Sequence, residues 1–491
     1  MLASECSTPV ARGRFLALPS RITTSGKLPS AASSSSSSPY FRPLRYAVLG
    51  AGFAGLSVVW HLLKHSSEGL NLRIDIFDEV GIGGGASGVS GGLLHPYSPK
   101  AKLLWRGAEC WKECLMLLSI AERAAFSEES NFELGQPGQC FDSFIVRRRG
   151  LLRPATSMKN LNVLLDNAQN CVASCRIETI GKETAQKLVP NICLPFNSAF
   201  YMPQAVNVHP LHYLQALFVA CKNLVKELST SSHGLKELYL HKKSVQKLIE
   251  FEGEYDAVII CLGAKADMLP ELSGRLPLRT CRGVIAHLQL PGNISLQVPV
   301  SGFWNCFGIH YKFFKRNKGS SSNAKKLNIQ NIYIYIYTYM EEYADHAPSI
   351  LSDAWFAVQG TRSLLMGSTW EWKSRNSSPN VSADEASRAL EELLPKVSAF
   401  YPGIKDWTFT GAKAGLRAMP PQTPQGSLPL LGCVNDFVGD NCICKYWLFG
   451  GLGSRGLLYH ARLGNLMAQA VLSCNEELIP TELTSWKNIN Q

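Results

Sequence analysis

The sequence has 491 residues, of which 46% are hydrophobic and 18% are charged, so it is long enough for two domains with large cores. Its net charge of +11 would suit a nucleic-acid-binding protein, but residues 1–45 carry +5 and residues 311–340 carry +6, which leaves the rest formally neutral. The total charge therefore does not indicate a basic domain, and a local basic patch stays an alternative. No apolar run reaches the roughly 18 residues of a membrane-spanning helix, so no integral membrane segment is expected.

Residues 1–43 are rich in Ser and in basic residues, contain a single acid and include the run Ser33–Ser38. This composition is typical of an organelle transit peptide. We expect import into the chloroplast, with the mitochondrion as the alternative destination. The competing interpretation is an ordinary disordered tail.

The segment RYAVLGAGFAGLSVVWHLL, which begins at Arg45, predicts a strand, a tight glycine turn and a helix. The turn at residues 50–55 fits GxGxxG and would present backbone N–H groups to a pyrophosphate. A second strand, Leu72–Phe77, leads to Asp78 and Glu79, where an acid would bind a ribose hydroxyl. We favour Asp78, the final residue of the strand; the competing interpretation is a glycine turn between packed elements.

A second glycine-rich loop follows at Gly81–Pro96, with seven glycines and two serines in sixteen residues. It lies directly before the helix-like segment Ala101–Leu118. Such a loop allows backbone to approach the far end of a long cofactor. FAD sites often have one, whereas NAD sites do not require it.

The middle of the chain alternates between the two predicted domains. Pro210–Leu228 predicts a helix with Pro at its first position. A weaker strand is expected around Val245, and Tyr255–Ala264 predicts a buried parallel strand that ends at the same crevice. Strand-like segments predominate from Phe126 to Tyr201 and from Cys281 to Trp407, which predicts a second domain that caps the first.

The C-terminal part returns to the cofactor-binding pattern. Tyr446–Leu472 predicts a strand, a glycine turn and a long helix, and its turn at residues 451–456 again fits GxGxxG. A second dinucleotide site is one interpretation, but no strand with an acid follows. We favour a helix N-terminus that points at the ring of the first cofactor, where the helix dipole favours negative charge.

Together these motifs resemble the D-amino-acid oxidase family of FAD enzymes, which includes glycine and sarcosine oxidase. The resemblance covers about Leu44–Leu472 and rests on the first glycine turn, GGGASGVSGG, GLRAMPP and GLGSRGLLYHARLGN. The last two motifs are most similar to the oxidase half of the bacterial bifunctional enzyme that builds 5-methylaminomethyl-2-thiouridine in tRNA. This chain lacks the separate methyltransferase domain of that enzyme.

The resemblance implies an α/β fold, in which a Rossmann-like FAD-binding domain is interleaved with a mainly β-sheet substrate domain. We assign residues 44–125, 202–280 and 408–491 to the first and residues 126–201 and 281–407 to the second.

The resemblance also implies which residues bind FAD: the pyrophosphate turn, the ribose acid, the middle of the cofactor, the adenine side, and the flavin end. In this order they are Gly50, Ala51, Gly52, Phe53, Ala54 and Gly55; Asp78 and Glu79; Gly85, Ala86, Ser87 and Gly92; Val245 and Gly263; and Gly453, Ser454 and Gly456. No metal site is expected.

Members of this family remove hydride from the carbon beside an amine, the imine product hydrolyses, and oxygen commonly reoxidises the flavin. Arg417 matches the position at which glycine oxidase binds the substrate carboxylate. The alternative role of Arg417 is a structural ion pair between the two domains. Arg455 lies in the flavin-side turn and would stabilise reduced flavin or contact substrate; its alternative is helix packing. His95 could face the flavin, and Trp304, Trp370 and Trp372 could line a substrate pocket, although such residues are more often structural.

We therefore expect an FAD-dependent amine or amino-acid oxidoreductase whose substrate carries a carboxylate and whose electron acceptor is oxygen. One alternative is removal of a carboxymethyl group from a modified wobble uridine in tRNA; the neutral body of the chain weighs mildly against it, and the resemblance weighs mildly for it. The other is a non-catalytic FAD-binding protein.

Residues 311–342 interrupt the second domain. The first half is basic and rich in Ser and Asn, and Ile and Tyr alternate from Ile332 to Tyr337. We interpret this segment as an insertion outside the functional fold, such as a translated intron. The alternative is a genuine loop or an added edge strand.

Overall fold

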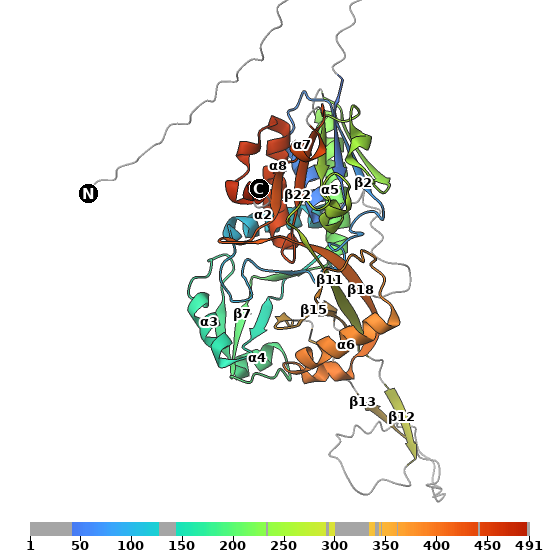
Figure 1. The fold of residues 1–491 in the computed structure, drawn as a ribbon. Helices are drawn as coiled ribbons and strands as arrows, with labels where there is room; N and C mark the ends of the chain where they lie inside the picture. Colours follow the sequence, from blue (N-terminus) through green and yellow to red (C-terminus); the bar gives the residue numbers. More distant parts are fainter. Residues whose placement is uncertain are drawn as a thin grey trace, which may run out of the picture. The chain divides into compact units, whose positions relative to one another are not determined.

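The computed structural model describes residues 42–126, 144–231, 234–290, 294–299, 333–338, 343–344, 346–360, 362–439 and 442–488 (Figure 1). The chain divides into two units, residues 1–42 and residues 43–491, and the described helices and strands belong to the second. Almost all of the predicted transit peptide lies outside the described residues, so it stays a prediction.

A six-stranded sheet carries the first glycine turn, in the strand order β21-β22-β10-β1-β2-β9. Its strands are β1 (Leu44–Leu49), β2 (Leu72–Asp78), β9 (Lys236–Lys242), β10 (Ala257–Ile260), β21 (Leu430–Cys433) and β22 (Lys445–Gly450). Neighbouring strands are parallel, except β21 and β22. The order β9-β2-β1-β10 is that of a doubly wound, dinucleotide-binding sheet, which confirms the predicted Rossmann-like fold.

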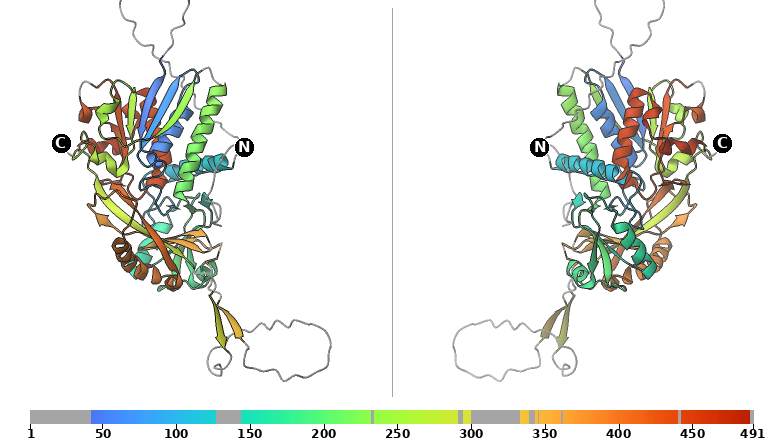
Figure 2. Two further views of the ribbon diagram at one scale, coloured as in Figure 1. Left: turned by 90° about the vertical axis from the view of Figure 1, so that its right-hand side faces the viewer. Right: turned by 90° about the vertical axis from the view of Figure 1, so that its left-hand side faces the viewer.

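Both faces of this sheet are buried, because successive side chains of a strand point to opposite sides. Val48 contributes to a core with four helices, whereas its neighbour Leu49 contributes to a core with Trp486 on the other face. The four helices are α1 (Phe53–His65), α2 (Gly107–Ala125), α5 (Pro210–Ser231) and α8 (Gly456–Ser473). Figure 2 shows α5 (green) and α8 (orange-red) running alongside the blue strands. Burial of both faces explains the continuous apolar runs of these strands.

A second, nine-stranded sheet has the order β17-β11-β16-β15-β14-β5-β7-β6, and β18 pairs with β11 in addition. Its strands are β5 (Leu151–Pro154), β6 (Glu178–Gly181), β7 (Ser198–Met202), β11 (Arg279–Gln289), β14 (Ser349–Leu351), β15 (Trp355–Gly360), β16 (Ser363–Gly367), β17 (Glu371–Trp372) and β18 (Thr408–Met419). It is antiparallel apart from the pair β5 and β14. This sheet confirms a mainly β-sheet part of the fold.

Three helices accompany the nine-stranded sheet: α3 (Met158–Ala168), α4 (Lys182–Leu188) and α6 (Ala383–Ser398). Helix α6 begins after Ser382, whose hydroxyl accepts a hydrogen bond from the Glu385 N–H at 3.2 Å, as the spacing Ser-x-x-Glu predicts. Leu393 and Val397 of α6 share a core with residues of β11 and β15. The predicted domain boundary between residues 407 and 408 assigns β18 to the FAD-binding domain. In the structure, β18 pairs with β11 along its length and so belongs to the nine-stranded sheet.

The remaining elements are short. They are β3 (Leu93–Leu94), β4 (Val146–Arg147) and β8 (Val206–Val208) in one sheet, β19 (Gln422–Thr423) with β20 (Gly426–Ser427), and the helices α7 (Asn435–Val438) and α9 (Thr481–Thr484). The strand expected around Val245 is wrong: β9 ends at Lys242, and Val245 follows in an irregular segment. Among the described helices, none is long and apolar enough to cross a membrane.

The alternating Ile and Tyr residues from Tyr333 to Tyr337 lie in a strand. It is β13 (Tyr333–Thr338), which pairs antiparallel with β12 (Ile294–Pro299) in a two-stranded sheet of its own. The other residues of the segment 311–342 lie outside the described part of the chain. The interpretation of this segment as an insertion therefore stays a prediction.

Candidate functional site

A cavity of about 1200 Å³ lies where the parallel strands of the six-stranded sheet end. Gly50, Asp78, Cys261 and Gly450, at the ends of β1, β2, β10 and β22, all line it. The carboxyl ends of parallel strands meet at one edge of a doubly wound sheet, so four turns far apart in the sequence surround one space. Residues of β5, β11 and β18 from the nine-stranded sheet line it too. Its volume exceeds that of ordinary ligand pockets and suits a long cofactor together with a substrate.

Each glycine of the first turn has a steric reason to be glycine. Gly50 has φ of +105°, and a Cβ there would lie 2.5 Å from the Cys261 carbonyl oxygen. A Cβ at Gly55 would lie 1.9 Å from the Gly50 oxygen, and one at Gly52 would lie 2.8 Å from Ser87 Oγ. The turn therefore keeps side chains away from the start of α1, where helix N–H groups that have no intrahelical partner can receive an anion.

Asp78 ties the end of β2 to the glycine turn. Its carboxylate accepts hydrogen bonds from the N–H groups of Ala51, Val80 and Gly81 at 2.9, 3.0 and 2.9 Å. Glu79 is engaged differently: it forms an ion pair with Lys265, which holds the pKa of Glu79 below its usual range. Asp78, unlike Glu79, thus holds its carboxylate against the glycine turn, which favours Asp78 over Glu79 as the ribose ligand.

The second glycine-rich loop serves both the cavity and the packing. Ser87 Oγ accepts a hydrogen bond of 3.2 Å from the Phe53 N–H, the first of α1. A Cβ at Gly85 would meet no atom within 4 Å, so this backbone faces open space. Gly91, in contrast, packs against Trp355, whose ring would lie 2.4 Å from an added Cβ. Part of the glycine density therefore serves contact with the nine-stranded sheet.

Most predicted cofactor residues line the cavity. They are Gly50, Gly52, Phe53, Ala54, Asp78, Glu79, Gly85, Ala86, Ser87, Gly92, Val245, Gly263, Gly453, Ser454 and Gly456. Ala51 and Gly55 are not among the lining residues. Ala51 acts by donating its N–H to Asp78, and Gly55 by packing against Gly50, so both shape the turn from behind.

Arg417 lies on β18, and the nine-stranded sheet holds its side chain. Its guanidinium carbon lies 4.0 Å from the centroid of the Trp370 ring. Nε and Nη2 donate to the carbonyl oxygens of Cys281 and Thr369 at 3.4 and 2.9 Å, Nη2 also reaches Cys281 Sγ at 3.5 Å, and Nη1 donates to Ser368 Oγ at 3.3 Å. Burial lowers the pKa of Arg417. No carboxylate in the described part of the chain pairs with it, so the structural ion pair is not found there.

Two of the three candidate tryptophans lie beside Arg417. Trp370 lines the cavity, and Trp372 stacks on it with ring centroids 5.9 Å apart. Trp372 is 46% exposed, and Arg279 lies over its ring at 5.1 Å. Trp304 lies outside the described residues.

Arg455 and His95 also line the cavity. Arg455 directly precedes α8, and no described carboxylate forms an ion pair with it. His95 is buried; its Nδ1 accepts the Tyr97 N–H at 3.2 Å, which places the proton of a neutral ring on Nε2. Burial lowers the pKa of His95 well below its ordinary value, and Arg455 and Arg153 lower it further.

Sequence reasoning missed three features of the cavity: Arg153 on β5, Ser368, and the loop 375–379. No motif surrounds Arg153 or Ser368, and only the order of the strands brings them to the cavity. Trp370, a candidate pocket residue two positions after Ser368, also lines the cavity, but it does not single out Ser368 itself.

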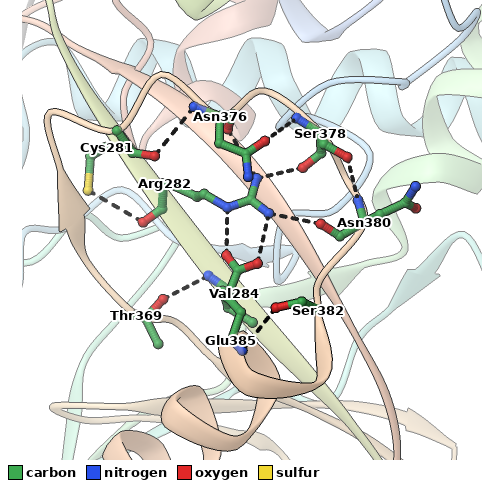
Figure 3. Close-up of polar contacts among 10 residues, drawn as sticks. Cys281, Arg282, Val284, Thr369, Asn376, Ser378, Asn380, Ser382 and Glu385 are labelled. Carbon is green, nitrogen blue, oxygen red and sulfur yellow. Dashed lines mark hydrogen bonds and ion pairs between the residues drawn. The ribbon is translucent and has the colours of Figure 1, made fainter.

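Arg282 on β11 fixes the loop that lines the cavity (Figure 3). It is 1% exposed and forms an ion pair with Glu385 at 2.7 Å. It also donates to the carbonyl oxygens of Asn376, Ser378 and Asn380 at 3.1, 2.5 and 2.9 Å. This buried arginine has acceptors on every side, which marks it as structural.

A family model described as "FAD dependent oxidoreductase" (DAO) matches residues 45–470. The chain belongs to this family. A Rhizobium etli protein named as a thiamine biosynthesis oxidoreductase, ThiO, is 27% identical over 259 residues, which cover 52% of this chain and 64% of that protein. The match therefore spans less than two thirds of that relative.

Solved structures of low sequence identity share the FAD-dependent oxidoreductase fold. Iminodiacetate oxidase from Chelativorans sp. BNC1 has a TM-score of 0.58 at 18% identity, with 90% of this chain and 98% of that one covered. Glycine oxidase from Geobacillus kaustophilus has a TM-score of 0.56 at 16% identity, with 88% of this chain and 96% of that one covered. L-Proline dehydrogenase from P. horikoshii has a TM-score of 0.60 at 14% identity, with 91% of this chain and 98% of that one covered.

FAD is the cofactor of this family, and the cavity fits it. The glycine turn leaves the N-terminus of α1 open to a pyrophosphate, with Ser87 Oγ beside its first N–H. Gly85 and Gly263 face space in which a Cβ would meet nothing within 4 Å. These residues would hold the nucleotide part, and the turn that ends at Arg455 would hold the opposite end.

Proposed function

We propose that the chain oxidises the C–N bond of an amine or amino acid that carries a carboxylate. The imine then hydrolyses to a carbonyl compound and a smaller amine, and oxygen takes up the electrons. The names of two fold neighbours, iminodiacetate oxidase and glycine oxidase, agree with a substrate of this class.

The observation that carries this proposal is the state of Arg417. An arginine has five N–H donors. Those of Arg417 have four acceptors among the described residues, which leaves one N–H of Nη1 without an acceptor there. Ser368 Oγ lies 3.3 Å from Nη1 and lines the cavity too. One free N–H and one hydroxyl thus form a pair of donors suited to the two oxygens of a carboxylate.

The residues of the chain hold and orient the substrate. FAD, when bound, accepts the hydride from the carbon beside the amine. Trp370 fixes the plane of the Arg417 guanidinium, so the carboxylate has one preferred direction. His95 is neutral because of its burial and keeps a proton on Nε2 as a donor toward the cavity.

Anaerobic titration of the FAD-loaded protein tests the proposal. Glycine, sarcosine and iminodiacetate are compared with methylamine, which lacks a carboxylate, and bleaching of the visible flavin band reports reduction. We expect bleaching only with carboxylate-bearing amines. Arg417→Met should weaken their binding by at least 30-fold, since losing one partner of a buried charge pair costs about 2–5 kcal/mol.

Two further variants complete the test. Ser368→Ala should weaken binding about tenfold, as expected for a hydrogen bond to a charged group. Arg123→Met, an exposed arginine of α2 outside the cavity, is the matched control and should change nothing. Equal bleaching by methylamine, or unchanged affinity in yellow, folded Arg417→Met, would contradict the proposal.

One observation favours tRNA as a second candidate substrate. Trp370, exposed Trp372 and Arg279 form an aromatic and cationic rim beside Arg417, and such surfaces bind single-stranded nucleic acid. The test is incubation with tRNA that carries 5-carboxymethylaminomethyluridine, followed by mass analysis of the nucleosides. Loss of the carboxymethyl group supports this candidate, and an unchanged nucleoside removes it. Failure of both substrate classes would favour a non-catalytic FAD-binding protein.

A further inference from the structure

A second cationic group lies in the cavity, formed by Arg153 and Arg455. Arg153 comes from β5 and is 8% exposed. Its guanidinium makes one long hydrogen bond, from Nη1 to the Ser98 carbonyl oxygen at 3.5 Å. No described carboxylate forms an ion pair with Arg153 or Arg455. Both arginines line the same cavity. Burial first, and then repulsion by Arg455, lowers the pKa of Arg153 to about 10, while the carboxylate of Asp353, which also lines the cavity, acts in the opposite direction.

Comparison with Arg282 shows that this arrangement is incomplete. Arg282 is buried to a similar degree, and the fold supplies it with Glu385 and three backbone carbonyl groups. Arg153 instead has one long hydrogen bond within the described residues, a like charge in Arg455, and the Asp353 carboxylate, which attracts it without forming an ion pair. A buried charge without partners is costly, and an anion that binds beside it removes the cost. Arg153 therefore has the environment of a ligand-binding arginine.

The group is separate from the carboxylate site at Arg417. Arg153 is on β5 and Arg417 is on β18, and the strand order places five spacings between these strands, about 24 Å along the sheet. Arg417 is not among the charges that shift the pKa of Arg153 or His95. His95 lines the same cavity and, as a neutral ring with its proton on Nε2, adds an N–H donor there.

We propose that Arg153, together with Arg455 and His95, binds a second carboxylate of the substrate, so that the preferred substrates are amines with two carboxylates. One carboxylate binds at Arg417 and Ser368, and the other at Arg153. This inference rests on the proposed function, because it presupposes the carboxylate site at Arg417. It narrows the substrate class from amino acids in general to dicarboxylic amines long enough to span the cavity.

The test measures the binding of unreactive acids to the FAD-loaded full chain. Linear dicarboxylates from malonate to dodecanedioate are titrated against monocarboxylates of the same carbon number at constant ionic strength, because the strands that carry the two arginines are far apart in the sheet. Perturbation of the flavin spectrum and calorimetry report the dissociation constants. At one chain length, we expect the dicarboxylate to bind at least tenfold more tightly than its monocarboxylate partner.

Variants assign this preference to Arg153. Arg153→Met should abolish it, while monocarboxylate affinity stays within twofold; Arg153→Lys should retain part of it. Arg417→Met should weaken both classes of ligand, and Arg123→Met should change neither. The absence of any dicarboxylate advantage in the unmodified protein overturns the inference, as does an equal loss of both classes in Arg153→Met. Monocarboxylate binding that depends on Arg417 would still support the proposed function, so the two can fail separately.

Discussion

Gly52 is the residue at which a side chain would most directly block the cofactor. A Cβ there would lie 2.8 Å from Ser87 Oγ, and a branched side chain would enter the space in front of α1. We predict that Gly52→Val folds but is purified without flavin, because the backbone no longer reaches the pyrophosphate. The absorbance spectrum and the FAD content after denaturation measure this.

Gly69 provides the matched control, because it lies in the turn before β2, at the opposite edge of the same sheet. An added Cβ at Gly69 meets no atom within 4 Å. Gly69→Val should therefore retain FAD at the level of the unmodified protein. A fully loaded Gly52→Val protein would show that this turn does not hold the cofactor.

Arg282 sets the stability of the loop beside the cavity. Arg282→Met leaves Glu385 and three carbonyl groups without their donor, so we predict that the free energy of unfolding falls by about 3 kcal/mol or more at neutral pH. Denaturant unfolding followed by tryptophan fluorescence measures the loss. Arg388→Met, which changes an exposed arginine of the same helix as Glu385, should cost far less.

The effect of Arg282→Met should depend on pH in a defined direction. In the unmodified protein, Arg282 holds the pKa of Glu385 below its usual range. The stability that this pair contributes is therefore present above the usual pKa of a glutamate and is lost as the pH falls through the lowered pKa. The difference between the two proteins should narrow as the medium becomes acidic. A difference that stays constant down to that range would mean that the ion pair is not its source.

At the scale of elements, the sequence predicted the six-stranded sheet better than the other sheet. The strand, turn and helix at residues 45–63, the strand that ends at Asp78, and the helix at Pro210–Leu228 all follow from local apolar periodicity and turn chemistry. The strand at Val245 was wrong because β9 ends at Lys242, and the apolar Val245 lies three residues beyond its end in an irregular segment.

The candidate site was predictable only where a motif marks it. Arg417 and Arg455 lie in motifs that resemble a known family, and both line the cavity. Arg153 and Ser368 reach the cavity through long-range strand pairing, from β5 and from the end of β16. Neither the period of a strand nor a local turn encodes such pairing, so no local signal identifies these residues.

The two-stranded sheet of β12 and β13 gives a prediction at the scale of elements. The two strands pair with each other and with no other described strand. Deleting Lys312–Met340 should leave FAD content unchanged, because no strand of the two large sheets is removed. It also removes β13 and exposes the edge of β12, so deleting residues 294–338 with a short Gly-Ser linker should give the more soluble protein. Analytical gel filtration and FAD content report the result.

Loss of FAD or of folding in both deletions would show that the segment belongs to the enzyme. Loss in the shorter deletion alone would instead be attributed to the unpaired edge of β12. An insertion outside the functional fold is tolerated in thermodynamic terms because the entropy cost of closing a loop rises slowly with its length.

At the scale of the whole molecule, the division of the chain after residue 42 coincides with a change in amino-acid composition. Strand β1 begins at Leu44 and pairs with β2 and β10, so the described sheet loses no strand when residues 1–41 are removed. We propose that residues 1–43 form a transit peptide. A reporter fused to residues 1–45 should enter the chloroplast, because the segment is basic, rich in Ser and almost free of acids. Imaging against plastid and mitochondrial markers measures this.

A second fusion tests whether charge is the reason. Replacing Arg12, Arg14, Arg21 and Lys27 with Gln preserves the length and the serine run but removes most of the positive charge. This fusion should remain outside the organelle, whereas the full chain truncated to begin at Arg42 should still bind FAD. Import into mitochondria instead of chloroplasts would change the destination and keep the transit function. A cytosolic reporter with the unmodified segment would mean that residues 1–45 carry no organelle address, and that their composition reflects only a polar tail.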